Sequence, residues 1–256
     1  MIDVAVLKEI VLHKGFCVIE NLFPEDEVYT LRKLLESAVE QHNQNLRSDT
    51  DRDMVHNCHE YSLKFIEPYQ HPLIDDMLSQ LLGYSYIIYA FQSSSLPPNG
   101  SNYARRIHCD SSRVIENYVT NIGVIITLDD YTKESGPIEF LPQSFKSTSK
   151  PTSDIFASKS EKIICNAGSC IIFNARTFHR EGINHLSRYR HSLTCNFCRC
   201  YMKQRFDYVR MAEASGSILR MTCEQRKLIG YNVRVPTSLD EFFLPSNKRM
   251  YLPNQE

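Results

Sequence analysis

Three side chains that commonly bind metal ions lie far apart in this sequence, and they constrain its fold most strongly. His108 and Asp110 are two residues apart, so in an extended segment both project from one face. His179 comes much later and must reach the same place from another strand. Two imidazoles and one carboxylate on one side of a metal form the facial triad that suits non-haem Fe(II), with coordination positions left open. The pattern predicts a metal site built from distant strands, the first over residues 103–110.

A second feature follows His179. Arg190 comes eleven residues later, and Ser192 lies on the same face of the strand expected there. A planar guanidinium binds a carboxylate through two parallel hydrogen bonds, and a nearby hydroxyl can add a third. Arg190 and Ser192 are therefore candidates for binding an acidic ligand beside the metal.

Taken together, these features resemble the phytanoyl-CoA dioxygenase-like branch of the Fe(II)/2-oxoglutarate oxygenases, over roughly residues 15–243. The segment from Asp129 to Phe145, which includes Ser-Gly-Pro-Ile-Glu-Phe-Leu-Pro-Gln-Ser-Phe at 135–145, is similar to a loop of that family. Gln143 stands where the family usually has glycine, and Phe145 where it usually has histidine. These two departures concern the contacts of the loop and leave the metal site untouched.

The resemblance implies a role for each candidate residue. His108, Asp110 and His179 would be the catalytic iron ligands, while Arg190, with Ser192, would hold the far carboxylate of 2-oxoglutarate. The amide of Gln92, at the end of an expected strand over residues 84–92, would face the pocket and bond 2-oxoglutarate or substrate. A glutamine bonded to neighbouring backbone is the alternative interpretation.

The implied activity is oxidation of an unactivated C–H bond in a small-molecule metabolite. Fe(II) and 2-oxoglutarate would be required, succinate and CO₂ would be formed, and ascorbate would serve as reductant in vitro. Asp110 argues against halogenation, because related halogenases have a small residue in place of this carboxylate. Hydroxylation, desaturation, epoxidation and ring closure stay open. So do a non-catalytic jelly-roll protein that binds a metal or ligand, and a hydroxylase of protein side chains.

The pattern of apolar residues predicts a mostly β fold with flanking α-helices, and several short strands separated by turns fit a double-stranded β-helix (jelly roll, cupin-like). We expect one domain over residues 1–256, with a core sheet at about 84–200 and helical support at both ends. The regions 93–100 and 147–160 are expected to be loops. Helices are expected over 4–12, 24–44, 71–83 and 222–230, and further strands over 15–22, 119–128, 162–165 and 169–173.

Composition excludes some classes of partner. The hydrophobic content of 42% and charged content of 23% are ordinary for a globular protein, and a net charge of −1 gives no basic surface for nucleic acid or an anionic membrane. No apolar run approaches the length needed to span a bilayer, and no export signal is visible. We expect a cytoplasmic protein with a small-molecule substrate. Its oligomeric state stays open.

Two further groups of residues permit a metal interpretation. The odd number of cysteines, nine, indicates reduced thiols, and Cys195, Cys198 and Cys200 are interpreted as buried packing residues on an expected strand rather than as zinc ligands. His56 and His59 would share a face only in a helix, which their segment does not favour, so a surface loop or a substrate contact is the preferred interpretation.

Overall fold

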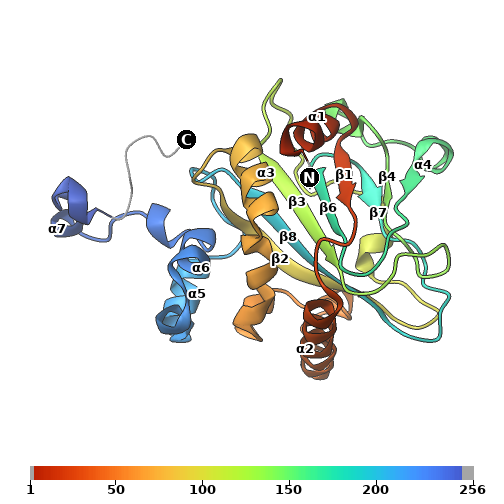
Figure 1. Cartoon of the computed structure of the whole chain (residues 1–256), viewed down its shortest axis with the longest axis horizontal. Coiled ribbons are helices and arrows are strands. Elements are labelled where there is room, and N and C mark those ends of the chain that lie inside the picture. Colours follow the sequence, from red (N-terminus) through yellow and green to blue (C-terminus); the bar gives the residue numbers. More distant parts are fainter. Residues whose placement is uncertain (1–2, 250–256) are drawn as a thin grey trace.

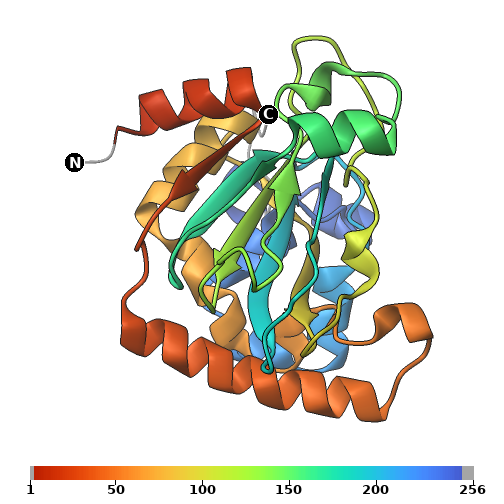
Figure 2. The same cartoon turned by 90° about the vertical axis from the view of Figure 1, so that its right-hand side faces the viewer.

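The computed structural model describes residues 3–249 and consists of two antiparallel sheets with helices around them (Figures 1 and 2). Among these residues no helix is both long and apolar enough to cross a membrane. The helices and strands are, in chain order, α1 (Val4–Lys14), β1 (Phe16–Ile19), α2 (Glu25–Gln44), α3 (Pro72–Leu82), β2 (Ile87–Leu96), β3 (Asn121–Thr127), β4 (Glu139–Phe140), α4 (Ser153–Lys159), β5 (Glu161–Lys162), β6 (Cys170–Asn174), β7 (His179–Arg180), β8 (Arg190–Cys198), α5 (Tyr208–Ala214), α6 (Cys223–Leu228) and α7 (Leu239–Phe242).

The larger sheet has five strands in the order β1-β6-β3-β8-β2, and the smaller has three in the order β5-β4-β7. In the larger sheet β8 lies between β3 and β2, with Thr194 opposite both Ile125 and Gln92. Side chains alternate between the two faces of a strand, so residues opposite one another share a face. The register therefore fixes which residues of β8 face the smaller sheet.

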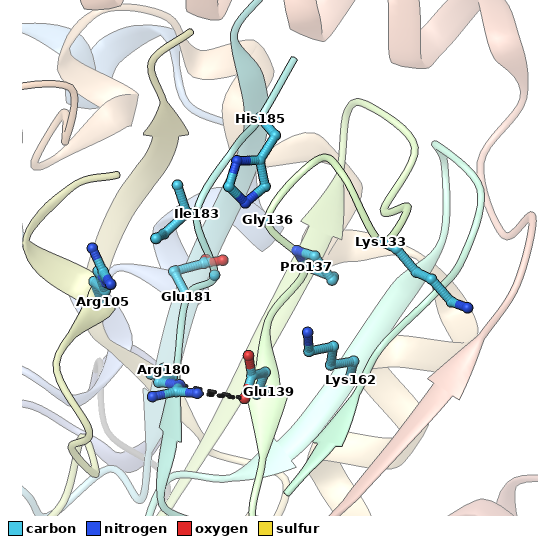
Figure 3. Close-up of a pocket in the computed structure, with 11 residues that line it drawn as sticks. Arg105, Lys133, Gly136, Pro137, Glu139, Lys162, Arg180, Glu181, Ile183 and His185 are labelled. Atoms are coloured by element: carbon cyan, nitrogen blue, oxygen red, sulfur yellow. Dashed lines mark hydrogen bonds and ion pairs between the residues drawn. The ribbon is translucent and has the colours of Figure 1, made fainter. Parts of the chain in front are cut away.

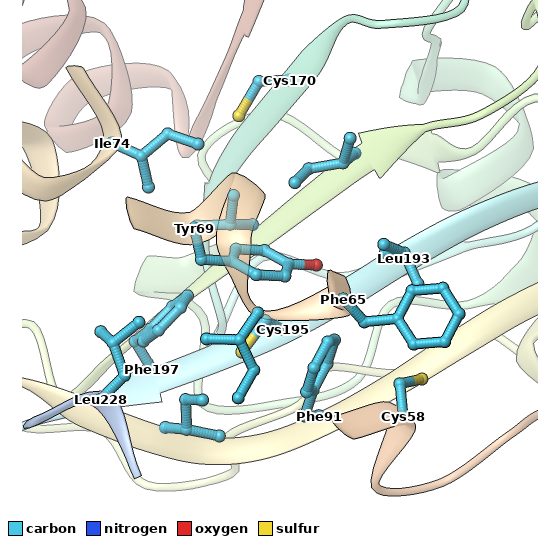
Figure 4. Close-up of a cluster of buried hydrophobic side chains, with 14 of the residues drawn as sticks. Cys58, Phe65, Tyr69, Ile74, Phe91, Cys170, Leu193, Cys195, Phe197 and Leu228 are labelled. Carbon is cyan, nitrogen blue, oxygen red and sulfur yellow. The ribbon is translucent and has the colours of Figure 1, made fainter. Parts of the chain in front are cut away.

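One face of the larger sheet packs on helices. Apolar residues of all five strands lie on this outer face, among them Ile172, Val124 and Cys195, and they join side chains of α2 and α3 in one buried cluster. Figure 4 shows part of this cluster, where the ring of Tyr69 meets Phe197 edge-on at 5.7 Å between centroids. Burying this surface is the main stabilising contribution that holds the helices against the sheet.

The other face of the larger sheet meets the smaller sheet. Phe16 and Phe173 on the larger sheet pack against Phe140 of β4, with ring centroids 4.8 and 5.0 Å from the Phe140 ring. These residues belong to a second buried cluster between the two sheets. The space between the sheets is thus apolar on the β1, β6 and β3 side.

The predicted helices are confirmed, and their ends are set by identifiable caps. The Asp3 carboxylate accepts a hydrogen bond from the Ala5 amide at the start of α1, and Gly15 ends that helix with a φ of 102°, a conformation that favours glycine. Thr222 and Gln225 form a capping box at the start of α6. The predicted strands over 15–22, 84–92, 119–128 and 169–173 are also found, with shifted ends. Of the strand predicted over 162–165, only Lys162 lies in a strand, β5, and Cys165 forms an isolated bridge.

Three local predictions were wrong. Residues 103–110 form no regular strand, because the Asn102 side chain caps a 3₁₀ turn at Tyr103–Arg105 and only His108 then pairs, in an isolated bridge to His179. Residues 93–96 continue β2 instead of forming a loop, since they pair along β8. Segment 147–160 contains α4, which Thr152 caps and which Phe156 anchors by its complete burial. The one-domain organisation stays a prediction.

Candidate active site

The side chains of His108, Asp110 and His179 converge, and their ligand atoms all lie within 4.8 Å of one another. Asp110 Oδ1 is 3.6 Å from His108 Nε2 and 3.7 Å from His179 Nε2. These distances exceed normal hydrogen bonds and leave room for one ion between the three atoms. Among residues 3–249 this is the one group of three or more such side chains close enough to hold a metal.

Backbone pairing brings the three residues together despite the missing strand. The amides of His108 and His179 each donate to the carbonyl of the other residue, at 3.0 and 2.9 Å. The Asp110 amide donates to the Ala175 carbonyl at 2.8 Å, so both early residues are tied to the segment that carries His179. An isolated antiparallel bridge and a few further backbone hydrogen bonds thus do what a longer strand was expected to do.

The two imidazoles are oriented in the same way. His108 Nδ1 lies 2.6 Å from the Arg106 carbonyl oxygen, and His179 Nδ1 lies 2.9 Å from that of Thr177. A carbonyl oxygen only accepts, so each Nδ1 carries a proton, and in the neutral ring it is then Nε2 that has the free lone pair. The two Nε2 atoms are also the ones nearest Asp110. Metal-binding histidines have this arrangement, with one ring nitrogen hydrogen-bonded and the other directed at the metal.

Asp110 is oriented by a relay that the sequence analysis missed. Asn196 Nδ2 donates to Asp110 Oδ2 at 3.3 Å, and Asn196 Oδ1 accepts from Asn121 Nδ2 at 3.1 Å. The relay leaves Asp110 Oδ1 directed at the histidines. Asn196 is an even number of residues from Arg190, and this strand spacing was the signal that could have identified it as facing the same space.

The cluster is closed on one side and open on the other. The His179 ring is buried against Phe140 and Phe173, with centroids 5.4 and 5.2 Å away, whereas His108 and Asp110 are partly open to solvent. Burial, followed by the proximity of His108, lowers the pKa of His179 to about 4. His179 is therefore neutral at pH 7 and can offer its Nε2 lone pair to a metal.

Arg190 lies on the face of β8 that is turned towards the smaller sheet, and it is completely buried. Its Nη2 donates to Glu181 Oε2 at 2.6 Å, while its Nη1 donates to the Tyr131 hydroxyl and to Ser192 Oγ. Burial alone would lower the pKa of Arg190, but the neighbouring Glu181 and Tyr131 raise it above the ordinary value, so the guanidinium stays charged. No pattern in the sequence had singled out Glu181 or Tyr131.

The other two predicted co-substrate residues lie on the same face. Ser192 is opposite Ser94, whose carbonyl accepts from the Ser192 hydroxyl at 3.2 Å, and Gln92 is opposite Thr194. Gln92 and Thr194 are only half-buried. Polar side chains therefore line this face along β8 and β2 from Arg190 to Asn196, in contrast to the apolar side near β1.

A pocket of about 190 Å³ lies on the opposite, outer face of the smaller sheet (Figure 3). Arg180 and Lys162 line it, and they point away from the metal cluster because they alternate with the inward-facing residues of their strands. Arg180 Nη2 makes an ion pair with Glu139 Oε2 at 3.0 Å there, as the dashed line in Figure 3 shows. Glu181, the next residue along, contributes to the pocket wall while its carboxylate binds Arg190.

The remaining candidate groups lie outside the cluster. His56 Nε2 is 3.5 Å from Asp51 Oδ1 and is bridged to β2 opposite Gln92, whereas His59 is buried among aromatic rings. None of the nine cysteines, all of which lie within residues 3–249, forms a disulfide. Cys195 and Cys198 are completely buried and Cys200 is partly buried.

A known protein family matches this chain. The model of the phytanoyl-CoA dioxygenase (PhyH) family matches residues 12–192, which is most of the chain. The chain belongs to the phytanoyl-CoA dioxygenase (PhyH) family, and with it to the superfamily of Fe(II)/2-oxoglutarate-type oxygenases. An oxygenase is thus the class of protein that the family and the His-Asp-His group define.

Individual proteins that resemble this chain share less than a third of its residues. The uncharacterized proteins Mb1539 of Mycobacterium bovis and Rv1501 of Mycobacterium tuberculosis are each 29% identical over 187 residues, covering 72% of this chain and 67% of theirs. Among solved structures, EvdMO1 has a TM-score of 0.63 at 17% identity, and AviO1 from Streptomyces viridochromogenes Tue57 has 0.61 at 17%. The match covers 76% of this chain and 50% of EvdMO1, and 77% and 96% for AviO1. At this identity the two structures show a shared fold.

Proposed function

We propose that this protein is a non-haem Fe(II)/2-oxoglutarate-dependent dioxygenase that oxidises an unactivated C–H bond of a small-molecule metabolite. The observation that carries the proposal is the convergence of His108 Nε2, His179 Nε2 and Asp110 Oδ1 with both lone pairs facing inward. Two neutral imidazoles and one carboxylate are the donor set expected for Fe(II) with open positions. Membership of the PhyH family supports the same choice.

We also propose that the two sheets are the walls of a double-stranded β-helix. Antiparallel pairing within each sheet, and the apolar cluster between the sheets, support this architecture. In such a fold, ligands bind between the walls, which is where the polar residues of β8 and β2 lie.

Each side chain then has a defined task. His108, Asp110 and His179 would hold the metal, and Asn196 would fix the orientation of the carboxylate. Iron bound there would supply the O₂ activation that oxidation of a C–H bond needs. Asp110 fills the third ligand position, which favours hydroxylation over halogenation.

The co-substrate would lie along β8. Arg190 and Ser192 would bind its far end, and Gln92 would contact the co-substrate or the substrate from β2. The partly exposed sides of His108 and Asp110 offer the substrate a way to the metal. Reduced thiols suit a cytoplasmic location.

The test is succinate formation. Purified protein with Fe(II), 2-oxoglutarate and ascorbate should form succinate slowly even without its substrate. Asp110→Ala should reduce this rate to the background of the reaction without protein, with an unchanged circular-dichroism spectrum. Succinate formation that is equal in the wild type and Asp110→Ala, or absent from the wild type, would contradict the proposal and would favour a binding protein.

A further inference from the structure

The guanidinium of Arg190 already has a charged partner. Glu181 and Arg190 are both buried, with side chains 5% and 1% exposed, and 2.6 Å separates Glu181 Oε2 from Arg190 Nη2. Together the two side chains carry no net charge. A dianionic ligand that approaches Arg190 therefore meets a neutral pair rather than a free cation.

The position of Glu181 on the guanidinium matters as much as its charge. A guanidinium can bind a carboxylate through two parallel N–H bonds on either of two edges, Nε with Nη2 or Nη1 with Nη2. Glu181 accepts from one of the two N–H groups of Nη2, which belongs to both edges, and Tyr131 and Ser192 accept from Nη1. Nε is buried and has no hydrogen-bond partner. Three of the five N–H groups of the guanidinium are engaged. The two left for a ligand are the one on Nε and one on Nη2, the nitrogen that already binds Glu181.

We propose that Glu181 determines the co-substrate specificity of this chain, by weakening the binding of a second carboxylate at Arg190. The inference rests on the proposed function. At Nε and Nη2 the far carboxylate of 2-oxoglutarate must either share Nη2 with Glu181, which places two buried anions on one cation, or displace Glu181 and leave that buried carboxylate unpaired. A 2-oxo acid with an uncharged far end meets no such obstacle and can pack beside the neutral pair. 2-Oxoglutarate should therefore bind with little advantage over such an acid.

The experiment compares two ligands that differ only in the far carboxylate, 2-oxoglutarate and 2-oxopentanoate. Calorimetry on protein loaded with Mn(II) gives both dissociation constants without turnover. In the wild type the two constants should lie within tenfold of each other. In Glu181→Gln, 2-oxoglutarate should bind at least tenfold more tightly than in the wild type, while 2-oxopentanoate changes by less than threefold.

Glu139→Gln is the matched control. Glu139 is also a buried carboxylate paired with an arginine, but its partner is Arg180 on the outer face of the smaller sheet (Figure 3). This variant should keep the wild-type ratio of the two constants.

A wild type that prefers 2-oxoglutarate by more than tenfold would overturn the inference, and this measurement needs no variant to fold. An unchanged ratio in folded Glu181→Gln would overturn it as well. Failure of both acids to bind any of the three proteins would be a different result, because it would overturn the proposed function together with the inference.

Discussion

At the residue scale, local hydrogen bonds decide what each side chain can do. In His108 and His179 the ring Nδ1 is bonded to the carbonyl two residues earlier, so the same short-range contact presents Nε2 twice. Arg190 differs, because contacts to side chains more than two residues away along the chain, Glu181 and Tyr131, occupy two of its five N–H groups. What a side chain can bind thus depends on the hydrogen-bond partners that the fold gives it.

The Arg190–Glu181 pair leads to a prediction about stability. Arg190→Ala should lower the free energy of unfolding by about 3–5 kcal/mol, because it leaves the Glu181 carboxylate buried without its partner. The double variant Arg190→Ala with Glu181→Gln should lose less than the sum of the two single variants. Urea unfolding of the four proteins measures the coupling.

Arg180→Ala serves as the comparison for that cycle. Arg180 is 31% exposed and Glu139 also accepts from Ser160 Oγ, so the loss of Arg180 should cost less than the loss of the completely buried Arg190. Equal losses for Arg180→Ala and Arg190→Ala would show that burial does not set the strength of the pair.

His59 gives a prediction on pH. It is 2% exposed and stacks on Phe91, and burial lowers its pKa to about 4, below the value near 6.5 expected in the unfolded chain. The unfolded state therefore takes up a proton first as the pH falls below 6.5, and the folded state loses stability down to about pH 4. Near pH 5 the loss from His59 should be about 2 kcal/mol relative to pH 7.5.

The check is His59→Leu, which puts an apolar side chain that does not titrate at this buried position. The difference in unfolding free energy between pH 7.5 and pH 5 should be smaller in the variant than in the wild type by about 2 kcal/mol. The same pH dependence in both proteins would mean that His59 is not the group that titrates.

At the element scale, β8 connects the core with the site. One face of the strand carries Leu193, Cys195 and Phe197 into the cluster under the helices, and the other carries Arg190 and Asn196 towards the smaller sheet. Alternation along one strand thus ties the stability of the core to the placement of the site residues.

The thiols of β8 can be tested on that basis. Cys195→Ser should cost about 1–3 kcal/mol of unfolding free energy, because a hydroxyl is poorly satisfied in the apolar cluster shown in Figure 4. The exposed Cys223→Ser should change stability by less than about 0.5 kcal/mol. Succinate formation per folded molecule should change little in either variant.

The packing role can also be contradicted by metal analysis. The result that would do so is stoichiometric zinc in the wild type that is lost from a variant lacking Cys195, Cys198 and Cys200.

Elements with strong local signals were predictable from the sequence. The apolar stripe and acidic first turn of α2, and the capping residues of α6, were visible in the chain. The extended continuation of β2 through three serines was not, because those serines are held by pairing with β8 rather than by their own propensity. The cluster of Phe156 with Leu141 and Phe178 similarly depends on contacts between distant segments.

The candidate site shows the same contrast between residues with a local sequence signal and residues placed by distant contacts. His108, Asp110, His179 and Arg190 stood out because their spacing is distinctive. Asn196 and Glu181 did not, since each acts through one contact with a residue far away in the sequence or across the sheets. Partners of this kind become visible only when the register is known.

At the scale of the whole molecule, helices cover one face of the larger sheet and the smaller sheet covers the other (Figures 1 and 2). The helices α5 and α6 lie to one side of the sheets in Figure 1, well away from α4. The space between the sheets is apolar near β1 and polar near β8 and β2, so the fold separates an apolar packed region from a polar one. The His-Asp-His group is open to solvent on one side of this arrangement.

Equilibrium metal binding tests the central claim most directly. Under anaerobic conditions the wild type should bind one Fe(II) per chain. His179→Ala should bind none with comparable affinity, while His56→Ala should bind one ion as the wild type does, because His56 pairs with Asp51 outside the cluster. Full Fe(II) binding by folded His179→Ala, or no binding by the wild type, would contradict the assignment of His108, Asp110 and His179 as one iron site.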